Sequence, residues 1–378
     1  MRNQKKFFQI YFKISRIISI FLVALVVFNS GSLIAFAWEQ DAHMVINKKA
    51  LQNFQKYEKY AKKYYNNHVD LSFKVTSPKV TSTSKTSYYH TQEWKKQQAR
   101  YHISHGGYSA DEPHLYVSVK HFYNPITSNG PHQLTDLAQY HGIGWDALPA
   151  TNWGLTRTEN PYSLKQAMIN YKKSMEIPSD SSVSTIPVTG DFRDFAGEPS
   201  SVEEMRNMYA GKAMRGLGEV LHLVADMTQP AHVRNDAHPK WEITESAIKK
   251  LTAITLVKEP RRDDLNILGV GDTTEDIMRE IAYWTNKRFY SEDTMYDPDT
   301  KVLPKNKMKP FLSPIFPNFV EKEYKGYPTW FQKFSGLDIP MFRKERDWSF
   351  VNYRYIITSD FAVKQGKILI PLAVAGCK

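Results

Sequence analysis

The stretch Leu221-His222-Leu223-Val224-Ala225-Asp226-Met227-Thr228-Gln229-Pro230-Ala231-His232 combines a helix end with three groups that can bind a metal ion. His222 and Asp226 are four residues apart, so on a helix they lie on one face, about a turn apart. Pro230 should end this helix, because proline cannot continue the hydrogen-bond ladder and the residue before it avoids helical geometry. The chain can then turn His232 back toward the same cavity.

Pairs of histidine and an acid at this spacing say little when they are only counted. With 12 histidines and 39 acidic residues in 378 positions, about one pair is expected by chance. The four pairs in the chain are His132/Asp136, His222/Asp226, His232/Asp236 and His238/Glu242. Three histidines and two suitably spaced acids fall between residues 222 and 242. This concentration favours metal ligands over a hydrogen-bonded core histidine.

The rest of the chain reads as mostly helical. Apolar positions at helical spacing predict helices over residues 41–63, 163–175, 274–289 and 361–375, the last interrupted at Pro371. Ser200-Ser201-Val202-Glu203-Glu204 resembles a capping box and predicts a helix from there to about Met227. Polar runs at 76–87 and 179–189 predict loops, and six prolines between Pro304 and Trp348 predict loops or a short hairpin. The expected fold class is all-α, with a single domain over residues 38–378.

Residues 1–37 read as an export signal. A basic stretch leads into the apolar run 17–28, and Ala35-Phe36-Ala37 follows as an A-x-A cleavage pattern. Cleavage there would make Trp38 the first residue of a secreted protein. An uncleaved membrane anchor is the alternative, because residues 17–37 approach the roughly 20 residues that span a bilayer.

The net charge of the chain bears on the kind of partner it could bind. The net charge is +11, and residues 1–37 contribute five basic residues and no acids, which leaves +6 for the remainder. Such an excess suits a phosphate-bearing partner, either nucleic acid or an anionic membrane surface, while a solvated basic surface is the commoner explanation.

The single cysteine, Cys377, excludes an intrachain disulfide. Bound metal is one other way to stabilise an exported protein.

The residues around His222 resemble those of a known family. The spacing His222-x3-Asp226-x5-His232, with Thr-Gln-Pro before the last histidine and His238-x3-Glu242 after it, resembles the bacterial zinc-dependent phospholipase C family and its relatives, the P1/S1 nucleases. The other segments that agree are Asp111-Glu112-Pro113, Lys120-His121-Phe122-Tyr123-Asn124-Pro125, Trp38 with His43, and, more weakly, residues 289–294. The resemblance implies a helical bundle with three zinc ions at the base of a cleft.

The resemblance also implies the ligands of each ion. The three sets, by position, are Trp38, His43 and Asp226; Asp111, His121, His222 and Asp226; and His232, His238 and Glu242. In the family, the amine and carbonyl of the N-terminal tryptophan chelate one zinc, and one aspartate bridges that ion to a second. We take Asp111 as the candidate general base as well as a ligand, because a carboxylate beside the metal can orient a water without blocking the open coordination position.

The chain departs from the family pattern in three places. Only nine residues separate Asp111 from His121, which leaves Glu112 as an alternative ligand to Asp111. Asn124 stands where the family has the aspartate of its His-Phe-Tyr-Asp-Pro stretch. The gap after His232 is also short, so two other acids stay open beside Glu242, namely Asp236 and Glu245.

The implied activity is phosphodiester hydrolysis by zinc-activated water. Glu242 at the last ligand position favours a phospholipase C that releases diacylglycerol and a phosphorylated head group at a phospholipid membrane surface. A P1/S1-like single-strand nuclease is one alternative, favoured by the basic charge, and a non-catalytic secreted helical protein is the other. We infer no obligate protein partner. A separate C-terminal lipid-binding β-sandwich is not expected, because strand-like alternation at regular spacing is missing.

Overall fold

The structure is a computed structural model of the whole chain. It describes residues 40–64, 74–75, 97–111, 117–126, 132–135, 147–178, 180, 199–236, 273–291, 294, 319–334, 336–346 and 353–377. The expected signal peptide, the loop at 76–87 and most of the loop at 179–189 lie outside these ranges. Among the described helices, none is both long and apolar enough to cross a membrane.

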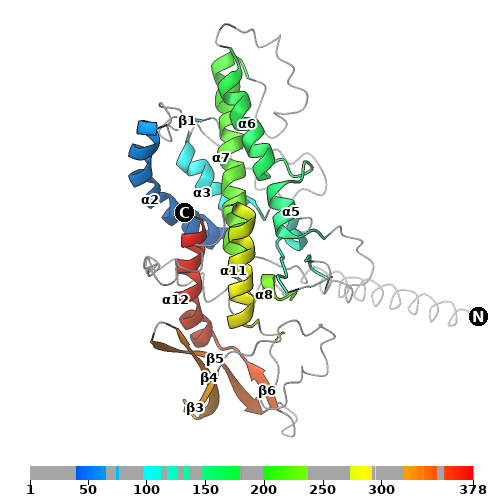
Figure 1. The fold of residues 1–378 in the computed structure, drawn as a ribbon, viewed down its shortest axis with the longest axis vertical. Helices are drawn as coiled ribbons and strands as arrows, with labels where there is room; N and C mark the ends of the chain where they lie inside the picture. Colours follow the sequence, from blue (N-terminus) through cyan, green and yellow to red (C-terminus); the bar gives the residue numbers. More distant parts are fainter. Residues whose placement is uncertain are drawn as a thin grey trace, which may run out of the picture.

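A long central helix organises the molecule (Figure 1). This helix, α7 (Val202–Asp226), packs against α3 (Ala99–Ser109) and α6 (Leu164–Glu176), and more lightly against α2 (Gln40–Tyr64) and α5 (Ala150–Leu155). The short α8 (Pro230–Val233) follows it after a break at Gln229. The lower half of α7 in Figure 1 is flanked by α11 (Thr274–Arg288) and α12 (Ser359–Gly376). The predicted helices at 41–63, 163–175, 274–289 and from the capping box to Met227 are confirmed.

Side-chain caps fix where three of these helices begin. Ser163 Oγ accepts from the backbone N–H of Gln166, and Ser201 Oγ accepts from that of Glu204. The Glu204 carboxylate accepts from the backbone N–H of Ser200, one residue before the N-cap, so the bonding is a variant of the capping box rather than its reciprocal pair. Thr273 caps α11 in the same way. Each cap satisfies backbone donors that the first turn of a helix leaves without a partner.

Helices α3 and α7 cross in backbone contact at two glycines. A Cβ atom on Gly218 would lie 2.1 Å from the carbonyl oxygen of Ile103, and one on Gly106 would lie 2.4 Å from that of Arg215. Asn47 of α2 joins the crossing, because its Nδ2 donates to Ile103 O at 3.1 Å and to Gly218 O at 2.9 Å. The crossing therefore holds α2, α3 and α7 at a fixed separation one turn away from His43 and His222.

The prediction of an all-α fold is wrong, because the chain also contains a four-stranded antiparallel sheet. Its strands pair in sequence order: β3 (Val320–Tyr324), β4 (Tyr327–Phe334), β5 (Leu337–Arg346) and β6 (Tyr353–Ile356). A two-stranded pair, β1 (Lys74–Val75) and β2 (Gln97–Gln98), lies elsewhere in the chain. The fold is thus mixed, with a helical body and a sheet at one end (Figure 1).

Two of the six prolines that led us to expect loops, Pro328 and Pro340, lie within strands, and the other four lie outside the described residues. Pro340 pairs with Phe331 at the register shift of β4 and β5, and a bulge is a place where a strand tolerates the missing N–H of proline. Lys325 and Gly326, both at positive φ, form the two-residue turn between β3 and β4. The segment is longer and more regular than the short hairpin we expected. Several consecutive residues are buried in β4 and in β5. The sequence of these strands therefore lacks the alternation of apolar and polar residues by which a strand is recognised.

The last helix joins the sheet to the bundle. α12 runs through Pro371 without a break, so the predicted interruption there is wrong. Gln365 Nε2 donates to the carbonyl oxygens of Pro340 and Met341, at 3.2 and 2.9 Å, next to the strand irregularity. One cluster of buried apolar side chains includes residues of α2, α7, α11, α12 and the sheet.

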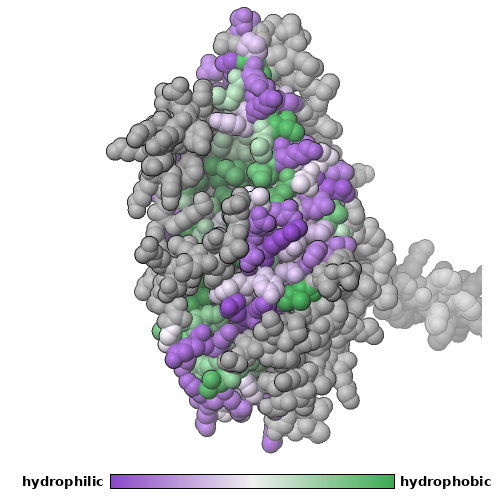
Figure 2. All heavy atoms as spheres, in the orientation of Figure 1, coloured by the Kyte–Doolittle hydropathy of each residue, from purple (hydrophilic) through white to green (hydrophobic). Residues whose placement is uncertain are grey.

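Hydrophilic side chains cover much of the described surface in the view of Figure 2. The exposed large apolar side chains include Met168 and Met175 on α6, Tyr283 on α11, and Val320 and Leu337 on the sheet. Apolar side chains that are scattered over several elements in this way are normal on a protein surface.

Candidate metal centre

Five of the predicted ligands meet where α2, α3 and α7 converge. His43 lies in the first turn of α2, Asp111 follows the end of α3, and His222 and Asp226 occupy the last turns of α7. His121 comes directly after a short 3-10 helix, η1 (Ser118–Lys120). All five side chains are fully or almost fully buried. The i, i+4 spacing on α7 thus places both of its ligands on the face that meets α2 and α3.

The two carboxylate oxygens of Asp226 face different histidines. Oδ1 lies 3.2 Å from His43 Nε2. Oδ2 lies 3.0 Å from His121 Nδ1 and 3.3 Å from His222 Nε2. The carboxylate therefore lies between one nitrogen, that of His43, and a second set of two nitrogens, those of His121 and His222. A carboxylate in this position could be shared by two metal ions.

Asp111 completes the second set. Its Oδ1 lies 3.4 Å from His121 Nδ1 and 3.5 Å from His222 Nε2, and these two nitrogens are 3.1 Å apart. Ligand atoms at about 2.0–2.1 Å from a tetrahedral zinc lie about 3.3 Å from one another. Five of the six distances that join Asp111 Oδ1, His121 Nδ1, His222 Nε2 and Asp226 Oδ2 run from 3.0 to 3.5 Å. The spacing fits a common ion.

Backbone carbonyls select which histidine nitrogen can bind metal. His222 Nδ1 lies 2.7 Å from Gly107 O, and His232 Nδ1 lies 3.1 Å from His121 O. Because a carbonyl oxygen only accepts, Nδ1 must carry the proton in both rings. Nε2 is then the metal-binding nitrogen, and in His222 it is the one that faces Asp111 and Asp226.

The cluster concentrates buried negative charge. The four carboxylate oxygens of Asp111 and Asp226 are buried and form no hydrogen bond with the described part of the chain. Burial raises the pKa of Asp226, but the charges of His222, His232 and His43 outweigh it and hold that pKa well below its usual range. Burial and the neighbouring His222 lower the pKa of His43 to about 4. The ionised, buried carboxylate of Asp226 needs a compensating cation, and a divalent metal ion would supply it.

The remaining predicted residues are less well placed. His232 is buried and its Nδ1 lies 3.9 Å from Asp226 Oδ2, but its ring stacks on Phe122 and it belongs to neither group of converging ligand atoms. Asn124 Oδ1 accepts from the backbone N–H of Ile126, which is a local structural role. Asp236 is buried beyond α8. The other candidates lie outside the described residues: Trp38, Glu112, His238, Glu242 and Glu245.

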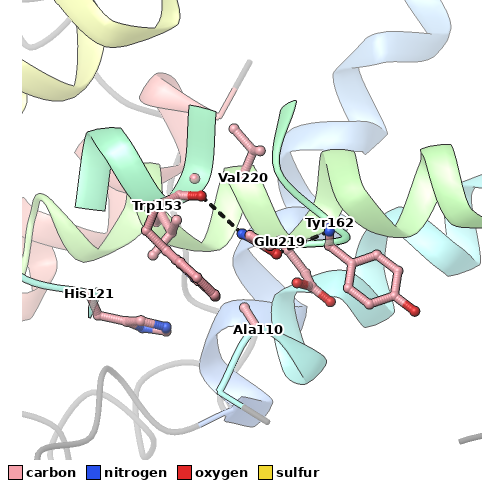
Figure 3. Close-up of a pocket in the computed structure, with 9 residues that line it drawn as sticks. Ala110, His121, Trp153, Tyr162, Glu219 and Val220 are labelled. Atoms are coloured by element: carbon pink, nitrogen blue, oxygen red, sulfur yellow. Dashed lines mark hydrogen bonds between the residues drawn. The ribbon is translucent and has the colours of Figure 1, made fainter. Parts of the chain in front are cut away.

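A small pocket adjoins the cluster on the side of His121 (Figure 3). Its lining includes Ala110, Trp153, Tyr162 and Glu219, and Glu219 lies three residues before His222 on α7. Sequence analysis missed Glu219 and the carbonyl of Gly107. The i−3 spacing of Glu219 from a candidate ligand was a usable signal, whereas nothing in a sequence marks a backbone oxygen.

Comparisons with known proteins add no assignment. No protein-family model, no curated protein and no solved structure matches this chain. The resemblance to zinc-dependent phospholipases C therefore stays a prediction from the sequence.

Proposed function

We propose that this protein is a zinc-dependent phosphodiester hydrolase that acts on phospholipids as a phospholipase C. The observation that carries the proposal is the position of Asp226, whose Oδ1 faces His43 and whose Oδ2 faces His121 and His222. A carboxylate shared by two close metal ions is the core of a centre that can hold both oxygens of a phosphodiester.

The residues present fit zinc. Imidazole nitrogen and carboxylate oxygen are ordinary zinc ligands. The carboxylate oxygens of Asp111 and Asp226 are buried without hydrogen bonds among the described residues, as expected for atoms that serve a cation instead. Their separations from the facing nitrogens, 3.0 to 3.5 Å, are those of atoms around one ion.

His43 and Asp226 would hold one ion, together with the amine and carbonyl of Trp38. A second would be held by Asp111, His121, His222 and Asp226, and a third by His232 with His238 and Glu242. Bound zinc would supply Lewis acidity, charge compensation for the phosphodiester and a water of lowered pKa. The protein's own contribution is to hold these ligands in a dry, fixed arrangement.

Asp111 is the proposed base. Its Oδ1 faces His121 and His222, which leaves Oδ2 to accept a proton. The oxygen of the attacking water forms a bond to phosphorus, the bond from phosphorus to the leaving oxygen breaks, and one proton of the water passes to Asp111. Asp111 then returns this proton to the leaving oxygen, so that the products are an alcohol and a phosphate monoester.

The substrate class follows from three further expectations. Export through the signal at residues 1–37 would bring the enzyme to membrane surfaces outside the cell. The excess of +6 in the remainder of the chain suits an anionic phosphate surface. Glu242 as the last ligand is the family feature that favours phospholipid over nucleic acid. With phosphatidylcholine the products would be diacylglycerol and phosphocholine.

The test compares substrates on zinc-loaded protein that begins at Trp38. We expect hydrolysis of phosphatidylcholine vesicles, loss of activity in excess chelator, and little release of nucleotides from single-stranded DNA. Asp111→Asn should lower the rate by about 10²–10⁴-fold, the usual contribution of a general base. Asp338→Asn is the matched control, because Asp338 is an exposed carboxylate on β5 that pairs with Lys322, far from the centre along the chain.

Cleavage of single-stranded DNA without phospholipid hydrolysis would replace the phospholipase with a nuclease. Zinc-loaded protein that hydrolyses neither substrate would contradict the proposal. Equal rates for Asp111→Asn and wild type would leave the hydrolase in place but remove Asp111 as its base.

A further inference from the structure

His121 differs from His222 and His232 in how its second nitrogen is satisfied. Its Nδ1 faces Asp111, Asp226 and His222. Its Nε2 is buried and has no hydrogen-bond partner among the described residues. When Nδ1 binds a metal ion, Nε2 carries the proton and becomes a donor. A buried N–H without an acceptor is unfavourable, because it has lost its hydrogen bond to water, so it should have one.

The other histidines with assigned hydrogen bonds follow the usual rule for metal ligands. His222 donates to Gly107 O and His232 donates to His121 O through their second nitrogens. Histidines that bind metal almost always donate this proton to a carbonyl, a carboxylate or a water, which fixes the ring and makes it a better ligand. For His121 the acceptor of this proton has to be found.

The pocket next to His121 indicates where the acceptor lies. His121 points into this pocket, and the carboxylate of Glu219 lies in the same pocket (Figure 3). The walls are formed by Ala110, Trp153 and Tyr162. The pocket has room for about one water molecule, and a water needs two to four polar partners to be held in such a place.

Glu219 is held in place by two groups that contact the same oxygen. Its Oε1 accepts from Arg215 Nε at 2.9 Å and from Ser109 Oγ at 3.1 Å. All three side chains are buried, and the guanidinium of Arg215 packs over the ring of Tyr162, 4.0 Å from its centroid. Oε2 is not used by either contact. Because Arg215 already balances the charge of Glu219, the site does not suit a cationic ligand.

We propose that Glu219 is a positioning residue for the metal centre, which orients His121 through one water molecule in this pocket. The water accepts the proton of His121 Nε2 and donates to Glu219 Oε2. Arg215 and Ser109 fix Glu219 through its Oε1. Helix α7 would then supply both a ligand, His222, and the support of another ligand, His121. The inference rests on the zinc centre of the proposed function and does not depend on the substrate.

The test measures zinc affinity by competition with a chelator, and the absorption spectrum of the cobalt(II)-substituted protein. We expect Glu219→Gln to weaken the affinity for one ion by about 10–100-fold, the usual effect of removing an outer-shell partner, and to change the cobalt spectrum. Glu275→Gln is the matched control, because Glu275 forms an exposed i, i+4 pair with Arg279 on α11. It should change neither readout.

Glu219→Gln also leaves Arg215 buried without its partner, so a second variant is needed. Ala110→Val fills the pocket and keeps the pair of Arg215 and Glu219 intact, and we expect the same loss of affinity and the same spectral change. Zinc affinity and spectra equal to wild type in both variants would overturn the inference alone. A wild-type chain that binds no zinc would overturn the proposed function and this inference with it.

Discussion

The proton on His222 Nδ1 is donated to the carbonyl oxygen of Gly107 at 2.7 Å, so a backbone atom of α3 orients a metal ligand on α7. The bond is possible because Gly106 and Gly218 let the two helices approach to backbone contact. The centre thus depends on a helix crossing as well as on its ligands, and this dependence gives the first prediction.

Gly218→Ala should weaken both the fold and the metal centre. The new Cβ would lie 2.1 Å from Ile103 O, so the helices must separate, and overpacking of this kind costs about 1–3 kcal/mol. We expect a melting temperature several degrees lower in the metal-free protein and weaker zinc binding, measured by thermal unfolding and chelator competition. An unchanged melting temperature would show that the crossing is looser than described.

His222→Ala should abolish hydrolysis and remove the stabilisation by zinc at the same time. A metal that binds only the folded state stabilises it by about 3–4 kcal/mol at 100 to 1,000 times its dissociation constant. We therefore expect the difference in melting temperature between zinc and chelator to shrink sharply in this variant.

His132→Ala is the control for that experiment. His132 is partly buried, its ring stacks on Tyr123, and its Nδ1 contacts Asn124 O, so it lies outside the cluster. Its loss should leave zinc content and hydrolysis unchanged and lower stability slightly. Full activity with unchanged zinc content in His222→Ala would contradict the metal centre.

Zinc binding should release protons near neutral pH. In the metal-free protein burial lowers the pKa of His222, but the charges of Asp226 and Asp111 outweigh it and raise that pKa to about 9. Below pH 9 its Nε2 therefore carries a proton that zinc must displace, while His43, with a pKa of about 4, is already neutral. Affinity should rise by up to about tenfold per pH unit from pH 7 to 9 and then level off. Calorimetry in buffers of different ionisation enthalpy measures the protons released, and a value of zero would contradict this assignment.

Most of the helical body and the five converging ligands could be predicted from the sequence, because both show in local residue spacing. His222 and Asp226 share a helix face by their i, i+4 separation, and Ser163, Ser201 and Thr273 start helices through contacts three residues away. Long-range features were harder to predict. The sheet was missed for two reasons. Pro340 is tolerated in β5 because it pairs at the bulge between Trp330 and Phe331. Packing with α12 also buries successive residues, which removes the alternation expected of a strand. Glu219 was missed because its role depends on a pocket formed by four segments of the chain.

Removal of the signal peptide should create a ligand. A free α-amine has a pKa near 8 and can lose its proton to bind zinc at neutral pH, whereas the amide nitrogen of an uncleaved chain cannot. We predict that protein beginning at Trp38 binds three zinc ions, while a form with one additional residue before Trp38 loses occupancy or affinity at the ion shared with His43. Zinc content and hydrolysis rates of the two forms, prepared side by side, measure the difference. Equal values would remove Trp38 from the site without affecting the other ligands.

If Asp226 is shared by two metal ions, its loss should remove both of them, and a count of zinc ions per chain measures this. Wild-type protein beginning at Trp38, Asp226→Asn and His43→Ala would be loaded with zinc, freed of unbound metal and analysed by mass spectrometry. We expect three ions for wild type, two for His43→Ala and one for Asp226→Asn, because a shared carboxylate supports two ions and His43 supports only one. Three ions in Asp226→Asn, or fewer than one in wild type, would contradict this expectation.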